Sequence, residues 1–278
     1  GSAFLYPAVM GCAQKWYADK KGLATGVIGG AVGLSGAALT LLVRFLSGRW
    51  GIRVCFWALG GAMLAVCAVG SALLENPENA QTPAAGGGPD LPPKKMLRTR
   101  QYRLLFLATA LGTPAVLLFS PVIVQLGQER GLSEGAAHLA VAIGSVGSAA
   151  GRLAMPALSD RIGRRAAALI LFAGLAGLSA AFAFAGGWWV IAVYTALTFC
   201  YSGEAAVLPS LCTDLFGLKH TGVNYGFLAL GMSAGSIGFP LAARALGLAA
   251  GRHWLAVGAA AAGFACLVAL RPTRGKRL

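Results

Sequence analysis

The sequence has few charged residues and very few acidic ones. Only 12% of its 278 residues are charged and nine are Asp or Glu, whereas about 25% of residues are charged in a typical soluble domain. Apolar residues make up 57% of the chain and stand in runs of roughly 20 residues, the length that crosses a bilayer as a helix. A soluble helical bundle would need charged faces along its helices, and the sequence lacks them. These features predict an all-α membrane protein.

Sequence patterns of enzymes and metal sites are also absent. The six cysteines lie within or at the ends of apolar segments without C-x-x-C spacing, so we interpret them as small hydrophobic residues. There is no nucleotide-binding P-loop, and the scattered charges inside apolar segments form no nucleophile–base pair or metal constellation. We predict that the protein is not an enzyme and has no catalytic residue, metal or cofactor.

The apolar segments predict one partial and eight complete membrane-spanning helices. The first segment, 1–14, is too short to span a bilayer, and the chain opens on Gly1 within it rather than on Met, so we expect its beginning to be missing. The complete spans are predicted at 23–46, 52–74, 102–127, 135–158, 166–186, 188–212, 223–247 and 253–270.

Lys and Arg residues are distributed unevenly between the connections. The longest connection, 75–101, is rich in proline and glycine, which is typical of a flexible linker. One set of alternate connections holds most of the basic residues, namely those at 15–21, 94–103, 161–165, 219 and 271–277. Because Lys and Arg concentrate on the cytoplasmic side, the linker and the C-terminus are predicted to be cytoplasmic. The net charge of +14 is then a topology signal and not a nucleic-acid patch.

An internal repeat relates two segments at an offset of 200 residues. Both segments run from the predicted cytoplasmic side outward, which indicates a parallel repeat of two helical bundles. Chance similarity between glycine-rich segments is the alternative. The matching pairs are Gly22 with Gly222, Gly26 with Gly226, Ser35-Gly36 with Gly235-Ser236, and Arg44 with Arg244.

Three strings resemble a known transporter family. Residues 15–26, KWYADKKGLATG, resemble the KWFPDKRGLATG signature of the oxalate/formate antiporter family, within the major facilitator superfamily. Residues 214–220, DLFGLKH, with Asn224-Tyr225-Gly226, resemble the DLFGTKH…NYG segment before helix 11 of that family. Residues 159–165, SDRIGRR, resemble the superfamily's cytoplasmic loop motif, here between helices 8 and 9.

The resemblance implies the major facilitator fold, of which this chain would supply part of helix 4 and helices 5 to 12 of a twelve-helix, two-bundle transporter. We expect a multi-pass protein of the cell inner (plasma) membrane that is monomeric in the lipid bilayer. The implied parts are the end of the N-terminal bundle (1–74), a cytoplasmic linker (75–101), a C-terminal six-helix bundle (102–270) and a basic cytoplasmic tail (271–278).

Arg152 is the main candidate for substrate binding. It precedes Ser159 by seven residues, or about 10 Å along a helix, which is deep for a side chain that only snorkels to the surface. An arginine fork can bind a carboxylate through two hydrogen bonds. The resemblance also implies a substrate-binding arginine in helix 8, which Arg152 matches. Snorkelling, or bracing of the loop at Asp160, is the alternative.

Other polar side chains could bond to a carboxylate or join helices to one another. The resemblance also implies a lysine in helix 11 of oxalate carriers, eight positions after the Asn of the NYG segment. Met232 occupies that position here, which argues against oxalate itself. The polar candidates are Tyr6, Gln14, Gln125, Tyr201, Asn224 and Tyr225.

Glu204 is the only acidic residue inside a predicted span. Such charges are costly in a bilayer and are functional candidates, so Glu204 could carry a proton. A structural partnership with an arginine or with backbone donors is the alternative. Arg44 and Arg244 lie near the outer ends of their helices, where snorkelling is favoured over attraction of incoming anions.

Two basic loops are predicted to act as conformational locks that release as the bundles rock. A purely topogenic role for their basic residues is the alternative. The first loop contains Asp160, Arg161, Gly163, Arg164 and Arg165, and the weaker counterpart contains Asp19, Lys20 and Lys21.

The predicted function is secondary active transport of a small organic anion, a mono- or dicarboxylate, by alternating access. The carrier would work as an antiporter or with a co-transported proton. One alternative is proton-driven efflux of a drug-like compound, which would make Glu204 central. Another is a membrane sensor that keeps the fold without transport.

Overall fold

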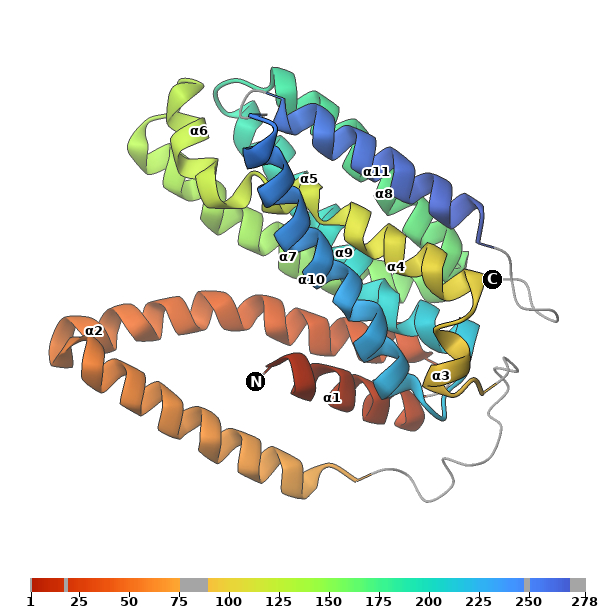
Figure 1. Ribbon diagram of the computed structural model, residues 1–278. Coiled ribbons are helices and arrows are strands. Elements are labelled where there is room, and N and C mark those ends of the chain that lie inside the picture. Colours follow the sequence, from red (N-terminus) through yellow and green to blue (C-terminus); the bar gives the residue numbers. More distant parts are fainter. Residues whose placement is uncertain (1, 18–19, 76–89, 248–250, 271–278) are drawn as a thin grey trace.

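The computed structural model is built from helices joined by short connections (Figure 1). It describes residues 2–17, 20–75, 90–247 and 251–270, with the main chain alone at 2–5, 34, 36–38, 40, 41 and 44. No strand occurs among these residues. Asp19, the middle of the linker, the Arg44 side chain and the tail 271–278 lie outside the described part of the chain.

The described helices match the predicted spans closely. Six spans within the described residues are long and apolar enough to cross a membrane, and α11 is a shorter apolar helix. The predicted span 23–46 is helical, but it is not among these six. This confirms the predicted all-α membrane architecture. In chain order the elements are α1 (Ser2–Trp16), α2 (Lys21–Leu73), α3 (Pro93–Met96), α4 (Arg100–Gly112), α5 (Pro114–Leu117), η2 (Ser120–Val122), α6 (Ile123–Glu129), α7 (Glu134–Ile162), α8 (Arg164–Phe184), α9 (Trp189–Phe216), α10 (Thr221–Ala245) and α11 (Arg252–Val268).

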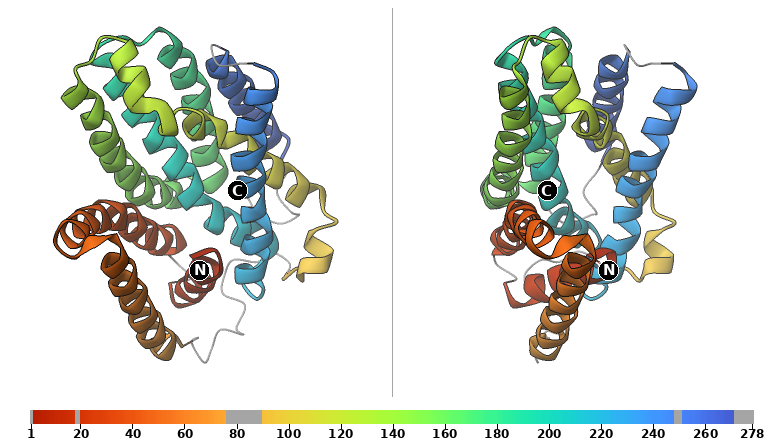
Figure 2. Two further views of the ribbon diagram at one scale, coloured as in Figure 1. Left: turned by 60° about the vertical axis from the view of Figure 1, so that its left-hand side comes forward. Right: turned by 90° about the vertical axis from the view of Figure 1, so that its left-hand side faces the viewer.

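Helix α2 contains two predicted spans, 23–46 and 52–74, joined at Gly51. This glycine has φ 77° and ψ 166°, a backbone conformation that residues with a Cβ rarely adopt. The chain folds back there, and the second half of α2 stands apart from the other helices (Figure 2). Within the span Phe45–Leu73, only 6% of the most apolar 18-residue stretch is buried against the rest of the protein.

The predicted span 102–127 is present but interrupted. Pro114 and Pro121 lack a backbone N–H and clash with the preceding helical turn, so each ends the helix before it. The span is therefore divided into α4, α5, η2 and α6. Thr113 relieves the first break, because its hydroxyl donates to the carbonyl of Ala110 at 2.8 Å.

Helices α4 to α11, here called the C-terminal bundle, share two large buried hydrophobic clusters and a smaller one around Met155 and Val207. One large cluster contains Phe119, Phe182 and Tyr194, and the other contains Phe172 and Phe216 with many leucines. Within this bundle α7 packs closely on α9, and α8 on α11. Burial of these apolar side chains against one another gives the helices fixed neighbours and so positions the polar groups between them.

The first half of α2 packs antiparallel on α7 through a glycine face. A Cβ added to Gly26 would lie 3.2 Å from the carbonyl oxygens of Arg152 and Leu153, and one on Gly33 would lie 3.1 Å from the Cα of Ala149. Small residues allow such close helix contact. The contact runs from Gly22 to Gly33, which is about 16 Å at 1.5 Å per residue, whereas Cβ atoms on Gly48 and Gly51 would meet nothing within 4 Å.

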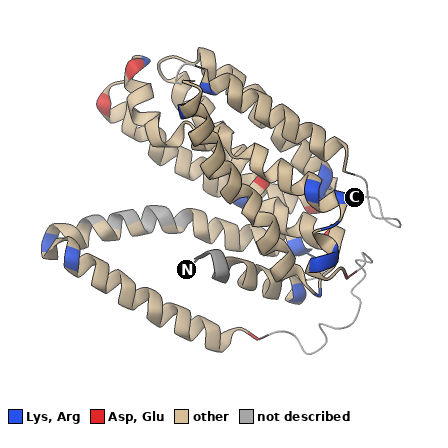
Figure 3. Cartoon of the chain, viewed as in Figure 1, with Lys and Arg blue, Asp and Glu red and all other residues tan. Residues whose placement is uncertain are grey.

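The two ends of the molecule differ in charge. The end where α1 finishes, α3 lies and α10 begins is here called the linker face, and most of the described Lys and Arg gather there (Figure 3). The opposite end, here called the far face, contains the glycine turns at Gly51, Gly131, Gly187 and Gly247, all with positive φ. Helices α1 and α2 contact the C-terminal bundle near the linker face and diverge from it toward the far face (Figure 1).

Gly151 offers a direct test of the α7–α9 packing. A Cβ at this position would overlap the main-chain carbonyl of Phe199, and backbone cannot move aside like a side chain. We expect Gly151→Ala to lower the stability of the detergent-solubilised protein by about 1–3 kcal/mol, measured by thermal unfolding. Gly177→Ala is the matched control, because a Cβ there meets nothing within 4 Å. Equal melting of the two variants would contradict the packing described.

Candidate functional site

Arg152 lies on α7 at the place where α2 crosses it. Its side chain is half-buried, and a Cβ on Gly29 would lie 3.4 Å from the Arg152 Cβ and 3.7 Å from its Cγ. The aliphatic part of the side chain is thus covered by α2. The buried Nε atom has no hydrogen-bond partner among the described residues. An arginine with an unused N–H donor where α2 meets α7 can bind an anion without breaking an existing hydrogen bond.

The three predicted tyrosines lie within electrostatic range of this arginine. Tyr6 comes from α1, Tyr201 from α9 and Tyr225 from α10, and the Arg152 guanidinium interacts electrostatically with all three hydroxyl groups. The rings of Tyr6 and Tyr225 have centroids 6.2 Å apart at an angle of 48°. Four helices therefore bring one cation and three phenol groups together. Phenol O–H groups can donate to the same anion that the guanidinium binds.

The structure does not bring Gln125 into this group. Gln125 is exposed on α6 near the far face, and its Nε2 donates to Glu129 Oε1 at 2.9 Å, an i,i+4 pair on the helix surface.

Asn224 holds the end of the linker. Its Nδ2 donates to the carbonyl of Leu91 at 3.0 Å, while the Leu91 N–H donates to the carbonyl of Phe216 at 2.9 Å. The Lys219 N–H also donates to Asp90 Oδ1 at 3.2 Å. The linker end thus docks on the turn between α9 and α10, and Asn224 lies beneath it, fully buried.

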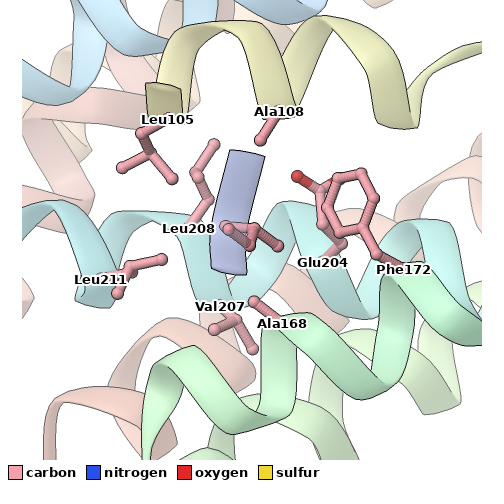
Figure 4. Close-up of a pocket in the computed structure, with 9 residues that line it drawn as sticks. Leu105, Ala108, Ala168, Phe172, Glu204, Val207, Leu208 and Leu211 are labelled. Carbon is pink, nitrogen blue, oxygen red and sulfur yellow. The ribbon is translucent and has the colours of Figure 1, made fainter. Parts of the chain in front are cut away.

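Glu204 faces the inside of the C-terminal bundle (Figure 4). It is 3% exposed, and its Oε2 has no hydrogen-bond partner among the described residues. The carboxyl borders a cavity of about 10 Å³, lined otherwise by apolar side chains such as Ala108, Phe172 and Leu208; this is close to the space that one water molecule needs. Glu204 interacts electrostatically with Tyr201 and Tyr225, but its oxygen points toward α4 and α8.

Met232, which takes the place of the expected helix 11 lysine, packs among apolar residues of the C-terminal bundle. Arg244 is exposed near the end of α10, as snorkelling requires. Neither residue adds a second positive charge beside Arg152.

Asp160, in the first predicted loop, joins α7 to the beginning of α2. Its Oδ1 and Oδ2 accept from the N–H groups of Gly22 and Leu23, both at 3.2 Å. These N–H groups lie in the first turn of α2, where the helix dipole favours a negative charge. A carboxylate of one helix group thus caps a helix of the other.

An ionic network surrounds this cap. Arg164 binds Asp160 at 2.8 Å and also Asp214 on α9, and Lys21 lies 3.6 Å from Asp214. Asp214 was not predicted as a site residue, although it opens the DLFGLKH string. The string showed a charge at a helix end, but spacing along the chain could not show that Arg164 and Lys21 meet it.

The other described residues of the two loops lie outside this ionic network. Arg165 donates to the carbonyls of Leu267 at 3.0 Å and Val268 at 2.6 Å, which caps the end of α11. Gly163 has φ 91° and forms the turn between α7 and α8. Arg161 and Lys20 are exposed.

Comparison with known proteins gives consistent similarities. The Major Facilitator Superfamily model matches residues 1–128 and 105–277. The oxalate:formate antiporter of Oxalobacter formigenes is 27% identical over 242 residues, covering 85% of this chain and 58% of the relative. The uncharacterized MFS-type transporter YhjX of Escherichia coli (strain K12) is 27% identical over 237 residues, covering 80% of this chain and 57% of the relative.

Among solved structures, the transporter FucP in the outward conformation matches with a TM-score of 0.62 and 18% identity, covering 80% of this chain and 55% of that one. This likeness supports the fold. The chain thus spans little more than half the length of these relatives.

The cap of α2 by Asp160 can be tested by removing its charge. Asp160→Asn keeps the size of the side chain but leaves one oxygen for two N–H donors. We expect this to weaken the contact by about 1–2 kcal/mol, measured as a lower melting temperature in detergent. Arg161→Gln, in which the neighbouring exposed side chain loses its charge, should melt like the parent protein. The cap is refuted if both variants behave alike.

Proposed function

Since this chain belongs to the major facilitator superfamily, we propose that the protein carries a small organic anion across a membrane by alternating access. The family match agrees with the family expected from the three sequence strings, and its members are transporters rather than enzymes. The proposed two-bundle division places residues 1–74 in one moving part and 102–270 in the other. The oxalate:formate antiporter among the relatives supports an organic anion as cargo.

The observation that carries the proposal is the position of Arg152. Its guanidinium lies where α2 meets α7, within electrostatic reach of Tyr6, Tyr201 and Tyr225, with its buried Nε unpaired among the described residues. In a site of low dielectric a bidentate arginine–carboxylate pair is strong and fixes the orientation of the carboxylate. Arg152 is proposed to bind the carboxylate and the tyrosines to hydrogen-bond it.

The charge of the site favours a monocarboxylate. Among the described residues around Tyr6, Tyr201 and Tyr225, Arg152 is the group with a positive charge, and Met232 takes the position of the second cation expected in oxalate carriers. A second carboxylate of the substrate would then be desolvated without a partner, which is costly. Formate- or lactate-like anions fit this balance better than oxalate.

The proposed orientation places the linker face in the cytoplasm, because Lys and Arg concentrate there. In this orientation the contact between α2 and α7 closes the cytoplasmic half of the pathway and leaves the outer half open. Asp160 and its ionic network would hold this closure and release it when the bundles rock the other way. The basic loops are proposed as locks on this basis.

Substitution of Arg152 tests the proposal. In proteoliposomes with the full-length protein, we expect Arg152→Gln to abolish exchange of labelled formate or lactate, because no charge remains to offset desolvation of the carboxylate. Arg152→Lys keeps the charge but loses the fork, and we expect it to raise KM by about tenfold or more, as loss of one charge-assisted hydrogen bond predicts. Retained exchange in Arg152→Gln, or a parent protein that moves no carboxylate, would overturn the assignment.

Substitution of Glu204 separates the anion carrier from proton-driven efflux. The carboxyl lies inside the C-terminal bundle and is 3% exposed, so a rigid rocking movement does not carry it from one side of the membrane to the other. We expect Glu204→Gln to retain exchange and its response to a pH gradient. Glu204→Leu should be at least as stable, because the Glu204 Oε2 has no hydrogen-bond partner among the described residues and the cavity around it is lined by apolar side chains. Loss of the pH response in Glu204→Gln, with exchange intact, would instead place proton coupling at this residue.

A further inference from the structure

One turn of α9 carries three of the polar contacts between the C-terminal bundle and the N-terminal helices. Ser210 meets Thr25 of α2 with the two hydroxyl oxygens 3.3 Å apart. Thr213 meets Gln14 of α1, and Asp214 meets Lys21 at the start of α2. Because α9 has 3.6 residues per turn, these three positions lie close together on its surface.

The contact between Thr213 and Gln14 is a buried hydrogen bond. The Thr213 hydroxyl donates to Gln14 Oε1 at 2.5 Å, and the Thr221 hydroxyl of α10 lies 2.9 Å from that of Thr213. Gln14, Thr213 and Thr221 are each at most 2% exposed. The backbones come close enough for this because α1 and α10 meet at glycines: a Cβ on Gly11 would lie 3.4 Å from the Gly222 nitrogen.

Thr25 and Ser210 extend this polar contact to α2. Both are fully buried, and the Thr25 hydroxyl also lies 2.9 Å from the carbonyl of Gly22 and 3.0 Å from that of Lys21. Uncharged polar groups therefore fill the interior of the closure, while the charged groups of Asp160, Arg164 and Asp214 lie nearer its rim.

We propose that Gln14, Thr25, Ser210, Thr213 and Thr221 form a polar gate, whose pairing sets how often the pathway opens at the linker face. In the closed arrangement Gln14 Oε1 accepts from Thr213, Thr213 is paired with Thr221, and Thr25 with Ser210, while Gln14 Nε2 has no partner among the described residues. In an open arrangement water satisfies them, so separation leaves no group unpaired. Removal of the Thr213 hydroxyl penalises the closed arrangement alone, because Gln14 Oε1 then stays buried without a donor. The gate rests on alternating access, but not on the identity of the substrate.

Thiol labelling in nanodiscs tests the gate without any transport assay. The full-length protein has every native cysteine replaced by alanine, including the six of this chain. It carries Ser210→Cys, a near-isosteric reporter at a position that is fully buried in the closed arrangement. A polar thiol reagent then labels the reporter at a rate set by the open fraction. We expect Thr213→Val to label about fivefold faster or more, the factor that one unpaired buried group represents, because it leaves Gln14 Oε1 without its donor. Gln14→Leu should label no faster than the parent, because Thr213 keeps the Pro209 carbonyl and the Thr221 hydroxyl as partners.

The matched control is Thr198→Val, the same substitution on the same helix. The Thr198 hydroxyl is buried and donates to the carbonyl of Gly144 at 2.8 Å, within the C-terminal bundle. In Thr198→Val the reporter cysteine should be labelled at the same rate as in the parent. In the double variant Gln14→Leu with Thr213→Val no unpaired group remains at this contact, so labelling should return toward the parent rate.

Two results would overturn the proposal. One is equal labelling in Thr213→Val and Thr198→Val, and the other is a double variant that labels as fast as, or faster than, Thr213→Val alone. A second background that retains only Cys212, which is fully buried inside the C-terminal bundle, detects general loosening. If Cys212 labelling rises with the reporter, the effect is loss of packing and the gate is rejected. Failure of carboxylate exchange would leave these outcomes unaffected.

Discussion

The approach of α2 to α7 is the contact on which the rest of the arrangement depends. Glycines on α2 let the two backbones meet along the half of the helices nearest the linker face. That contact places Asp160 over the first turn of α2, covers the aliphatic part of Arg152, and brings α9 beside Thr25. A side chain larger than a methyl group at Gly26 or Gly33 would separate all three. The polar contacts across the interface exist because the glycine face allows the backbones to meet.

The interface combines two kinds of polar contact that respond differently to water. The charged groups at the rim are partly exposed, so their attraction is moderate and sensitive to salt. The uncharged hydroxyl and amide groups inside are fully buried. A hydrogen bond that they lose is costly while they stay buried, but not when water reaches them. An apolar interface of the same area would be harder to separate, because opening would expose hydrophobic surface to water. The observed composition suits an interface that closes firmly and still opens.

Much of the fold followed from the sequence, because a bilayer forces each span to be long, apolar and helical. The spans on either side of Gly51, and α7 to α10, lie where hydropathy predicted them. The interruption at Pro114 and Pro121 was missed, although both prolines were visible, because the apolar run continued across them. The side of a helix on which a residue lies could not be predicted, because spacing along the chain gives no distance between helices. Tyr6, Tyr201 and Tyr225 lie within electrostatic range of Arg152, whereas Gln125 pairs with Glu129 on α6 and Asn224 holds the linker end. Glu204 likewise could be placed within its span but not on the side that faces α4 and α8.

The turn between α9 and α10 has a mechanical consequence. It receives the docked end of the linker through Leu91 and Asn224. On its other side Thr213, which is paired with Thr221, bonds to Gln14 of α1. A pull on the linker is therefore applied to the same few residues that hold the two helix groups together. The linker between the N-terminal helices and the C-terminal bundle therefore does not end at a site remote from their interface. It ends on the turn between α9 and α10, so a small displacement of the linker end strains the contact between Thr213 and α1.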